Sequence, residues 1–453
     1  MSGEPTSRSV LIVGAGCYGL STALHLLRRG YKDVTILDRA EHLPAQDAAS
    51  TDINKIVRSC YNDIFYTKLA REAISAWKSG EWDGCYHESG AVTLCTDYQR
   101  DTSYLNDIDI NSPLPDSVSV CERYPSALRE SSSLGTLSSA SGFFNKIGGW
   151  AEAERAVKIA LDKVKSLGAN VTPGKTVTSL VKDGGRTSGV ICSDGTTYRA
   201  DVVVLALGAW SSSAVPELKL DERCLAAGQT VATVQLEPEE FLHYKDCPVT
   251  LDFRTGFYVF PPTSQGVVKF AIHSAGYTNS IVPSHADDQR AISTPRTVLS
   301  HNEDGLRIPA TAAKQLRMYL AEVYPELAKK PFLNTRMCWY TDSPDGNWVI
   351  GYYPNDAGLV LATGGSGHGF KFLPTIGAIV ADALEHKLDD ATKARFAVDR
   401  GIVPGNSDRA AYYAVLPQEL DVTQLWGARD LAGMWEVLYL LISTLGCPGL
   451  IQW

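Results

Sequence analysis

The apolar residues of the first forty positions predict a strand, a helix and a second strand. Residues 9–13 and 34–37 are short apolar runs of the kind that buried parallel strands contain. Residues 20–29 repeat their apolar positions with helical spacing. A helix between two such strands is a βαβ unit, which places the strands side by side in one parallel sheet.

The same patterns predict further elements along the chain. Helical spacing and strong helix formers mark residues 65–77 and 150–167. Between residues 229 and 270, alternating polar and apolar positions predict an antiparallel sheet with one solvated face. Other apolar runs predict strands over residues 171–180, 189–193, 201–206 and 359–362.

Composition and charge narrow the class of protein. The 453 residues, 44% hydrophobic and 21% charged, are ordinary for a globular protein, and they exceed what one hydrophobic core usually organises. We therefore expect two domains. The formal net charge of -9 argues against a nucleic-acid partner, because clustered lysines and arginines bind phosphodiester backbones.

Cysteine usage and the two ends of the chain bear on location. Ten cysteines are scattered without a C-x-x-C pair or zinc spacing, which indicates a reducing compartment, no metal site and mostly inert thiols. The first ten residues lack the regions of a secretory signal, so we expect a cytoplasmic protein, with a peroxisomal one as the alternative. Residues 431–453 are apolar but interrupted by Glu436, Gly446 and Pro448, which predicts a packed terminal helix and no stable membrane span.

A glycine-rich loop follows the first predicted strand. Gly14, Gly16 and Gly19 form the spacing G-x-G-x-x-G at the start of the helix, where glycines permit a tight turn and a close approach to a pyrophosphate. Asp38 ends the second strand, where a carboxylate accepts hydrogen bonds from a ribose hydroxyl. The loop predicts FAD or NAD, and repulsion by Asp38 disfavours the additional phosphate of NADP.

Several short segments, taken with this loop, resemble one enzyme family. They are residues 54–58 (Asn-Lys-Ile-Val-Arg), 336–342 (Arg-Met-Cys-Trp-Tyr-Thr-Asp) and 365–372 (Gly-Ser-Gly-His-Gly-Phe-Lys-Phe). With them the chain resembles the amine-oxidising flavoproteins of the sarcosine oxidase type over most of residues 8–390. It looks most similar to the fungal branch with fructosyl amino acid oxidases (amadoriases) and saccharopine or pipecolate oxidases.

The resemblance implies a fold class and domain boundaries. It implies an α/β protein in which a Rossmann-like FAD-binding domain is interleaved with an α+β substrate domain built on an antiparallel sheet. We expect the FAD-binding domain over residues 1–88, 148–222 and 338–395, and the substrate domain over residues 89–147 and 223–337. Residues 396–453 form a C-terminal extension to which no role is assigned.

The resemblance also implies how FAD is held. In this family the cysteine that matches Cys338 forms a thioether with the flavin ring, and the nearby Arg336 favours the thiolate that this bond requires. The alternative for Cys338 is a buried, inert thiol. A helix predicted over residues 370–384, directly after Gly369, would direct backbone N–H groups at the flavin. The predicted cofactor residues are Gly14, Gly16, Cys17, Tyr18, Gly19, Asp38, Arg39, Lys55, Val177, Cys338, Gly367, His368, Gly369 and Lys371.

Six residues match positions that act on the substrate or on oxygen in this family. Arg58 and Lys371 match a pair that clamps a substrate carboxylate, with Arg as a fork and Lys as a point charge. Lys269 matches a lysine near the flavin that assists the reduction of dioxygen. The positions that line the flavin or substrate cavity are matched by Lys55, Tyr258 and His273. For Arg58, Lys371 and Lys269 the alternative is a solvated surface residue, and for His273 it is a hydrogen-bonded histidine of the core.

The activity that the resemblance implies is the oxidation of a carbon–nitrogen bond. We expect a secondary amine or N-substituted amino acid as substrate and dioxygen as acceptor, with an imine and hydrogen peroxide as products. The sequence has no match to the acidic residue with which amadoriases grip the sugar, and residues 273–277 look more like the sarcosine or pipecolate pattern, so fructosyl substrates are disfavoured. The alternatives are a biosynthetic amine oxidase of fungal secondary metabolism whose imine product cyclises, an NAD-dependent amino acid dehydrogenase, and a flavoprotein without catalytic activity.

Overall fold

The structure is a computed structural model that describes residues 5–131, 133–135, 137, 140–282, 289–401, 416–427 and 430. The terminal helix expected over residues 431–453 lies outside the described residues. Within these ranges, no helix is both long and apolar enough to cross a membrane.

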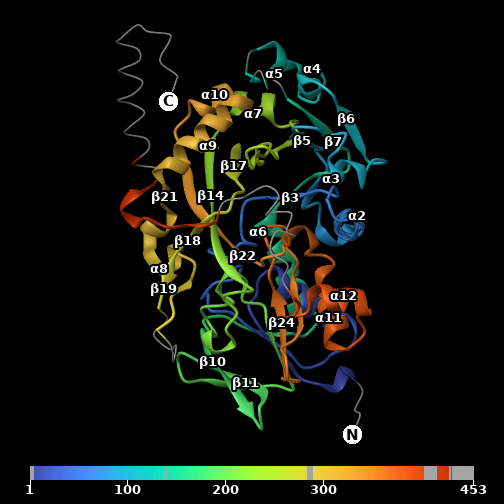
Figure 1. The fold of residues 1–453 in the computed structure, drawn as a ribbon, viewed down its shortest axis with the longest axis vertical. Coiled ribbons are helices and arrows are strands. Elements are labelled where there is room, and N and C mark those ends of the chain that lie inside the picture. Colours follow the sequence, from blue (N-terminus) through green and yellow to red (C-terminus); the bar gives the residue numbers. More distant parts are fainter. Residues whose placement is uncertain are drawn as a thin grey trace.

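A six-stranded sheet occupies one end of the elongated molecule (Figure 1). All its strands are parallel except β23, the edge strand that pairs with β24 in the antiparallel sense. The predicted βαβ unit is confirmed, since α1 (Cys17–Arg28) connects the first two strands. In spatial order the sheet contains β23 (Val349–Tyr352), β24 (Leu359–Thr363), β13 (Val202–Leu205), β1 (Val10–Val13), β2 (Val34–Leu37) and β9 (Asn170–Thr172).

A ten-stranded sheet occupies the other end (Figure 1). Its pairs are antiparallel except β15 with β5 and β18 with β25. In spatial order it contains β25 (Gln418–Glu419), β18 (Tyr277–Thr278), β14 (Leu225–Gln235), β17 (Val267–Ile272), β16 (Phe257–Val259), β15 (Val249–Asp252), β5 (Ala91–Cys95), β7 (Ser141–Asn145) and β6 (Asn111–Leu114), with β22 (Asn334–Asp342) also beside β14.

Helices and smaller sheets cover these two layers. The α-helices are α2 (Ile64–Trp77), α3 (Thr102–Leu105), α4 (Ser117–Cys121), α5 (Ser126–Glu130), α6 (Ala153–Ser166), α7 (Pro238–Tyr244), α8 (Val298–His301), α9 (Ala310–Val323), α10 (Pro325–Ala328), α11 (Ile376–Leu384) and α12 (Asp390–Phe396). The strands of the smaller sheets are β3 (Lys55–Val57), β4 (Tyr86–His87), β8 (Gly149–Ala151), β10 (Val177–Asp183), β11 (Arg186–Cys192), β12 (Thr197–Arg199), β19 (Ser280–Ile281), β20 (Ile292–Ser293), β21 (Ile308–Pro309) and β26 (Leu425–Trp426).

Three predictions of local structure are wrong. The helix predicted from residue 150 begins at Ala153, because Trp150 belongs to β8 and pairs with two distant strands. The strand predicted over residues 171–180 is divided between β9 and β10, which belong to different sheets. The solvated face predicted for the antiparallel sheet is absent from β14, where every residue between the two ends of the strand is buried.

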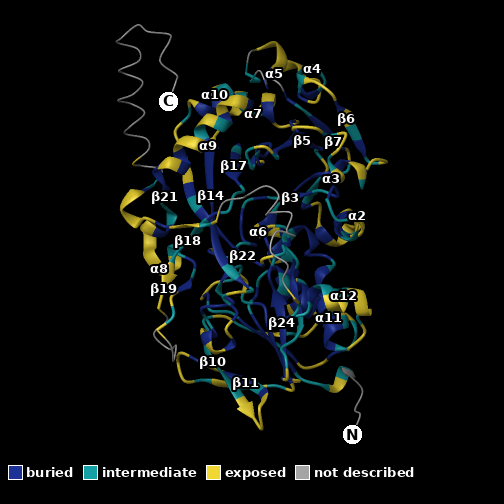
Figure 2. Cartoon of the chain, in the orientation of Figure 1, coloured by how far each residue is buried: buried dark blue, intermediate teal, exposed yellow. Residues whose placement is uncertain are grey.

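Burial explains why β14 has no solvated face. One face packs into a core with Phe270 and Leu316, while Val231 on the other contacts a cluster with Cys338 and Tyr340. Figure 2 shows this interior as continuously buried, with exposed residues on the outer sides of the helices and at the tip of β10 and β11. The strands that carry the candidate site are therefore held rigidly on both faces.

Candidate active site

Two cavities share a wall. The larger has a volume of about 430 Å³ and is lined by the glycine loop and the ends of β13 and β24. The smaller, of about 240 Å³, extends from β3 to β16. The residues that line both cavities are Lys55, Tyr340, Gly367 and Phe370.

The glycine loop is a tight turn that only glycine can form. Gly14 has a φ of 110°, and a Cβ atom there would lie 2.3 Å from the carbonyl oxygen of Ala206. A Cβ atom on Gly19 would lie 1.8 Å from the carbonyl oxygen of Gly14. Gly16 caps α1, so the free N–H groups of the first helical turn face the larger cavity. The loop fits a pyrophosphate.

The second strand presents Asp38 and Arg39 to the same cavity. The Asp38 carboxylate accepts hydrogen bonds from the backbone N–H groups of Ala15, at 2.8 Å, and Ala40, at 2.9 Å. Burial raises the pKa of Asp38, although these two bonds oppose the shift. The Arg39 guanidinium lies 3.9 Å from the centroid of the Trp210 ring. Asp38 thus fixes the loop as well as lining the cavity.

Ten of the predicted cofactor residues line the larger cavity and four do not. Those that line it are Gly14, Gly16, Cys17, Tyr18, Asp38, Arg39, Lys55, Val177, Gly367 and Gly369. The others are Gly19, Cys338, His368 and Lys371. Gly19 packs against the loop itself, whereas His368 and Lys371 line the smaller cavity.

Cys338 lies beside the wall that the two cavities share. It is 1% exposed on β22, and its Sγ accepts a hydrogen bond from Lys55 Nζ at 3.3 Å. Arg336, which we expected to favour the thiolate, donates instead to the backbone carbonyls of Thr51 and Ala48. The cation that contacts the Cys338 thiol is therefore Lys55 and not Arg336.

A buried carboxylate joins Lys55 to Lys269. Asp52 Oδ2 accepts from Lys269 Nζ at 2.6 Å and lies 2.9 Å from Lys55 Nζ. Burial alone would raise the pKa of Asp52, but the charges of Lys269 and Lys55 outweigh it and hold the pKa well below 3.8. Burial lowers the pKa of Lys269 to about 8, against the opposing charge of Asp52. Lys269 is fully buried and lines neither cavity.

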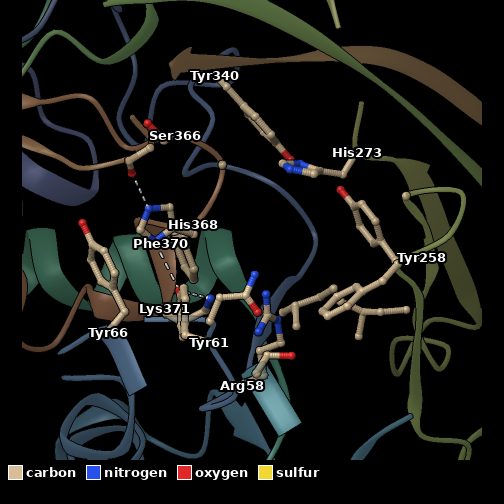
Figure 3. A pocket seen from close by; sticks show the side chains of 18 of the residues that line it. Arg58, Tyr61, Tyr66, Tyr258, His273, Tyr340, Ser366, His368, Phe370 and Lys371 are labelled. Atoms are coloured by element: carbon tan, nitrogen blue, oxygen red, sulfur yellow. Dashed lines mark hydrogen bonds between the residues drawn. The ribbon is translucent and has the colours of Figure 1, made fainter. Parts of the chain in front are cut away.

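The smaller cavity has its two cations on one side, and aromatic side chains line it both beside them and opposite them (Figure 3). Arg58 and Lys371 lie on one side, and Tyr258, His273 and Tyr340 lie opposite them. Burial, and then the charge of Arg58, lower the pKa of Lys371 well below 10.5. The His273 and Tyr340 rings are 5.8 Å apart between centroids. The two cations, 313 positions apart in sequence, are therefore brought to one wall.

The helix predicted directly after Gly369 is wrong in its starting point. Residues Phe370–Phe372 form a single 3₁₀ turn, and α11 begins only at Ile376. Pro374 lies between them and has no backbone N–H, so the α-helical hydrogen bonds cannot run through it. The N-terminus of α11 is therefore not at the glycine motif, and the 3₁₀ turn positions Lys371.

The sequence predictions missed three side chains of the site. Asp52 is the counter-ion of two lysines, Tyr61 is the partner of Lys371, and Tyr340 lines both cavities. Only Tyr340 had a clear signal, since it follows Cys338 by two positions on a strand and so shares its face. Asp52 and Tyr61 became recognisable as site residues through their contacts with Lys269 and Lys371, which are far away in sequence.

Comparison with known proteins identifies the family. The sequence profile of the FAD dependent oxidoreductase family matches residues 9–383. The chain belongs to this family. The resemblance to amine-oxidising flavoproteins and the predicted α/β fold class are both confirmed by the relatives and structures that follow.

The relatives extend over most of the chain. L-saccharopine oxidase of Schizosaccharomyces pombe is 32% identical over 410 residues, which cover 85% of this chain and 92% of that protein. Human peroxisomal sarcosine oxidase is 23% identical over 407 residues, which cover 84% of this chain and 93% of that protein. The fructosyl peptide oxidase structure from E. terrenum superposes with a TM-score of 0.82 at 28% identity, covering 92% of this chain and 97% of that one.

As a member of this family, the protein uses FAD. The family and its oxidase relatives set aside the alternatives of an NAD-dependent dehydrogenase and of a flavoprotein without activity. The residues present fit the cofactor. The glycine loop leaves the space that a pyrophosphate needs, and Asp38 lines the same cavity with a carboxylate that could accept from a ribose hydroxyl. The shared wall, with Lys55 and Gly367, would then adjoin the ring.

Proposed function

We propose that this FAD dependent oxidoreductase is an oxidase of a small N-substituted amino acid, which it converts with dioxygen to an imine and hydrogen peroxide. The observation that carries the proposal is the pair Arg58 and Lys371 on one wall of a cavity that adjoins the glycine-loop cavity. The names of the relatives, L-saccharopine oxidase and sarcosine oxidase, support the same substrate class. We further propose a cytoplasmic or peroxisomal location, the second as in the name of the human sarcosine oxidase.

The two cations would bind the substrate carboxylate. Arg58 offers a fork of N–H donors and Lys371 offers an ammonium group, so together they fix both the position and the rotation of a carboxylate. The bound anion would in turn favour the charged form of Lys371. A carboxylate held there leaves the amine-bearing carbon directed at the shared wall, which contains Lys55 and Gly367.

The opposite side of the cavity would shape the rest of the substrate. Tyr258, His273 and Tyr340 provide flat, mostly apolar surfaces that exclude water from the amine. When bound, FAD supplies the chemistry by accepting two electrons from the carbon–nitrogen bond and passing them to dioxygen. Lys55, with Lys269 behind Asp52, would place positive charge near the forming superoxide.

The chemistry of the Cys338 side chain supports covalent attachment of the flavin. The thiol lies beside the shared wall, and its Sγ accepts a hydrogen bond from Lys55 Nζ. We therefore propose Cys338 as the site of a thioether to FAD. After acid precipitation, the wild-type polypeptide should stay yellow and a Cys338→Ser variant should become colourless. A wild-type pellet without colour would refute the covalent bond but not the use of FAD.

Anaerobic titration tests the proposed function. The purified holoenzyme is mixed with sarcosine, pipecolate, saccharopine, an N-methylated aromatic amino acid or a fructosyl amino acid, and the flavin absorbance is recorded. We expect one or more N-substituted amino acids to bleach the flavin, and the matching amines without a carboxylate to bleach it far more slowly. Bleaching that is as fast without the carboxylate would contradict the role of Arg58 and Lys371.

A further inference from the structure

A chain of hydrogen bonds leads from Lys371 to an imidazole. Lys371 Nζ lies 2.5 Å from Tyr61 Oη, and Tyr61 Oη lies 3.2 Å from His368 Nδ1. His368 Nε2 lies 3.0 Å from the carbonyl oxygen of Gly346. Figure 3 shows the three side chains grouped on one side of the smaller cavity. The proposed carboxylate clamp of Arg58 and Lys371 uses neither Tyr61 nor the path to His368.

The direction of these hydrogen bonds follows from the donors and acceptors available. The carbonyl of Gly346 only accepts, so Nε2 of His368 carries a hydrogen and Nδ1 of the neutral ring is an acceptor. The Tyr61 hydroxyl therefore donates to Nδ1, and its oxygen accepts from Lys371. When a proton is added at Nδ1 of His368, the Tyr61 hydroxyl turns to Lys371, so the two hydrogen bonds of Tyr61 reverse while the bond from Nε2 to Gly346 stays.

The charge of Lys371 depends on what occupies the cavity. The titratable and charged groups near Lys371 are Arg58, Cys60 and Tyr61, and His368 is connected to it through Tyr61. Burial and the charge of Arg58 lower the pKa of Lys371, whereas Cys60 acts in the opposite direction. A carboxylate bound between Arg58 and Lys371 would favour the ammonium form, so its binding draws a proton to Nζ.

We propose that Tyr61 and His368 form a proton relay, which supplies the proton that Lys371 takes up when a substrate carboxylate binds. A solvent proton enters at Nδ1 of half-buried His368 and passes to Tyr61 Oη, while the hydroxyl proton of Tyr61 passes to Lys371 Nζ. Tyr61 and His368 end unchanged, and the amine of Lys371 has become an ammonium. The steps reverse when the carboxylate leaves.

This inference rests on the proposed carboxylate clamp, but its test needs no turnover. The flavin-loaded enzyme is mixed with acetate, a carboxylate without an oxidisable amine, and a pH-indicator dye records proton uptake while the flavin spectrum records binding. We expect the wild-type enzyme to take up protons on binding acetate, and the number of protons per site should rise toward one as the pH is raised.

Two variants separate the relay from general effects of burial. Tyr61→Phe keeps the ring but removes the hydroxyl, so acetate binding should weaken and proton uptake should slow, each about tenfold. His368→Gln keeps a donor for Gly346 but cannot carry the proton, so it should slow uptake in the same way. Tyr66→Phe is the matched control, since the Tyr66 ring stacks on Tyr61 while its hydroxyl donates to Asn347. Its proton uptake should equal that of the wild type.

The outcomes distinguish the relay from the function on which it rests. Equal uptake rates in Tyr61→Phe and the wild type would overturn the relay and leave the clamp in place. Absence of acetate binding would overturn the clamp and the relay together, whereas the amine oxidase activity is judged separately by flavin bleaching. Calorimetry of the wild type in two buffers of different ionisation enthalpy counts the protons without any variant, and a count of zero at every pH at which the holoenzyme is stable would also overturn the relay.

Discussion

The buried charges of this site are balanced by single residues, and Asp52 is the main example. Asp52 holds two lysines in a region that excludes water, and burial makes every uncompensated charge there expensive. Lys269, the innermost of these charges, donates only to Asp52 and to the backbone carbonyl of Asn54 among the hydrogen bonds described. Asp52 is therefore the residue on which the stability of the lysine pair depends.

Replacing Asp52 by asparagine should destabilise the protein. The variant leaves the Lys269 ammonium buried without its counter-ion, which costs about 3–5 kcal/mol of unfolding free energy near neutral pH. The pKa of Lys269, already lowered to about 8, should fall further in this variant. From about pH 8 to about pH 10 the folded state therefore binds fewer protons than the unfolded state. The stability of the variant should therefore rise with pH across that window, as urea unfolding would record.

The double variant Asp52→Asn with Lys269→Met is the control for this interpretation. Removing both charges leaves no unpaired ion, so part of the lost stability should return. Equal stabilities of the single and double variants would show that the buried lysine charge is not the cause.

At the scale of elements, the correct predictions are those that depend on local sequence. The runs over β1 and β2 are short and mostly apolar, and the helix between them has a regular apolar face, so their type follows from local length and pattern. Trp150 was placed in a helix because its neighbours are good helix formers, yet it forms a strand that pairs with β3 and β4. Those partners are distant in sequence, so no local pattern contains them. By contrast, Pro374 was a local signal against a continuous helix after Gly369.

The junction of β1 and α1 should not tolerate a side chain at Gly19. A Cβ atom there would lie 1.8 Å from a backbone oxygen that cannot move without opening the turn. We expect Gly19→Ala to lose FAD binding and about 1–3 kcal/mol of stability. The ratio of flavin absorbance to protein absorbance and the unfolding free energy would record both effects.

Gly80→Ala provides the matched control for this substitution. A Cβ atom on Gly80 meets no atom within 4 Å, so this variant should retain its flavin and its stability to within about 0.5 kcal/mol. Retention of full flavin content by Gly19→Ala would contradict the role of the loop as a pyrophosphate cradle.

At the scale of the whole molecule, the cofactor cavity joins distant parts of the chain. Its lining includes Gly14 near the start, Trp210 in the middle and Gly367 near the end of the matched region. A ligand that contacts all three segments binds only the folded chain, so it stabilises that chain by mass action. The cofactor is thus predicted to contribute to the stability of the whole fold.

Flavin addition to the Cys338→Ser protein tests this contribution. With the covalent bond removed, FAD at about one hundred times its dissociation constant should add about 2.7 kcal/mol to the unfolding free energy. FMN, which lacks the adenylate half that the glycine loop and Asp38 would bind, should add much less. Equal stabilisation by FMN and FAD would contradict the assignment of the larger cavity to the dinucleotide.

The sequence by itself determined the βαβ unit and the glycine loop, and its motifs pointed to Arg58, Lys371, Tyr258 and His273, because these features depend on short segments of the chain. The tertiary structure alone decided which of them meet. Lys55 contacts Cys338 across 283 positions, and Lys371 contacts Tyr61 across 310. Such pairs are set by how sheets and loops pack, and burial then determines their charge, so neither can be deduced from neighbours along the chain.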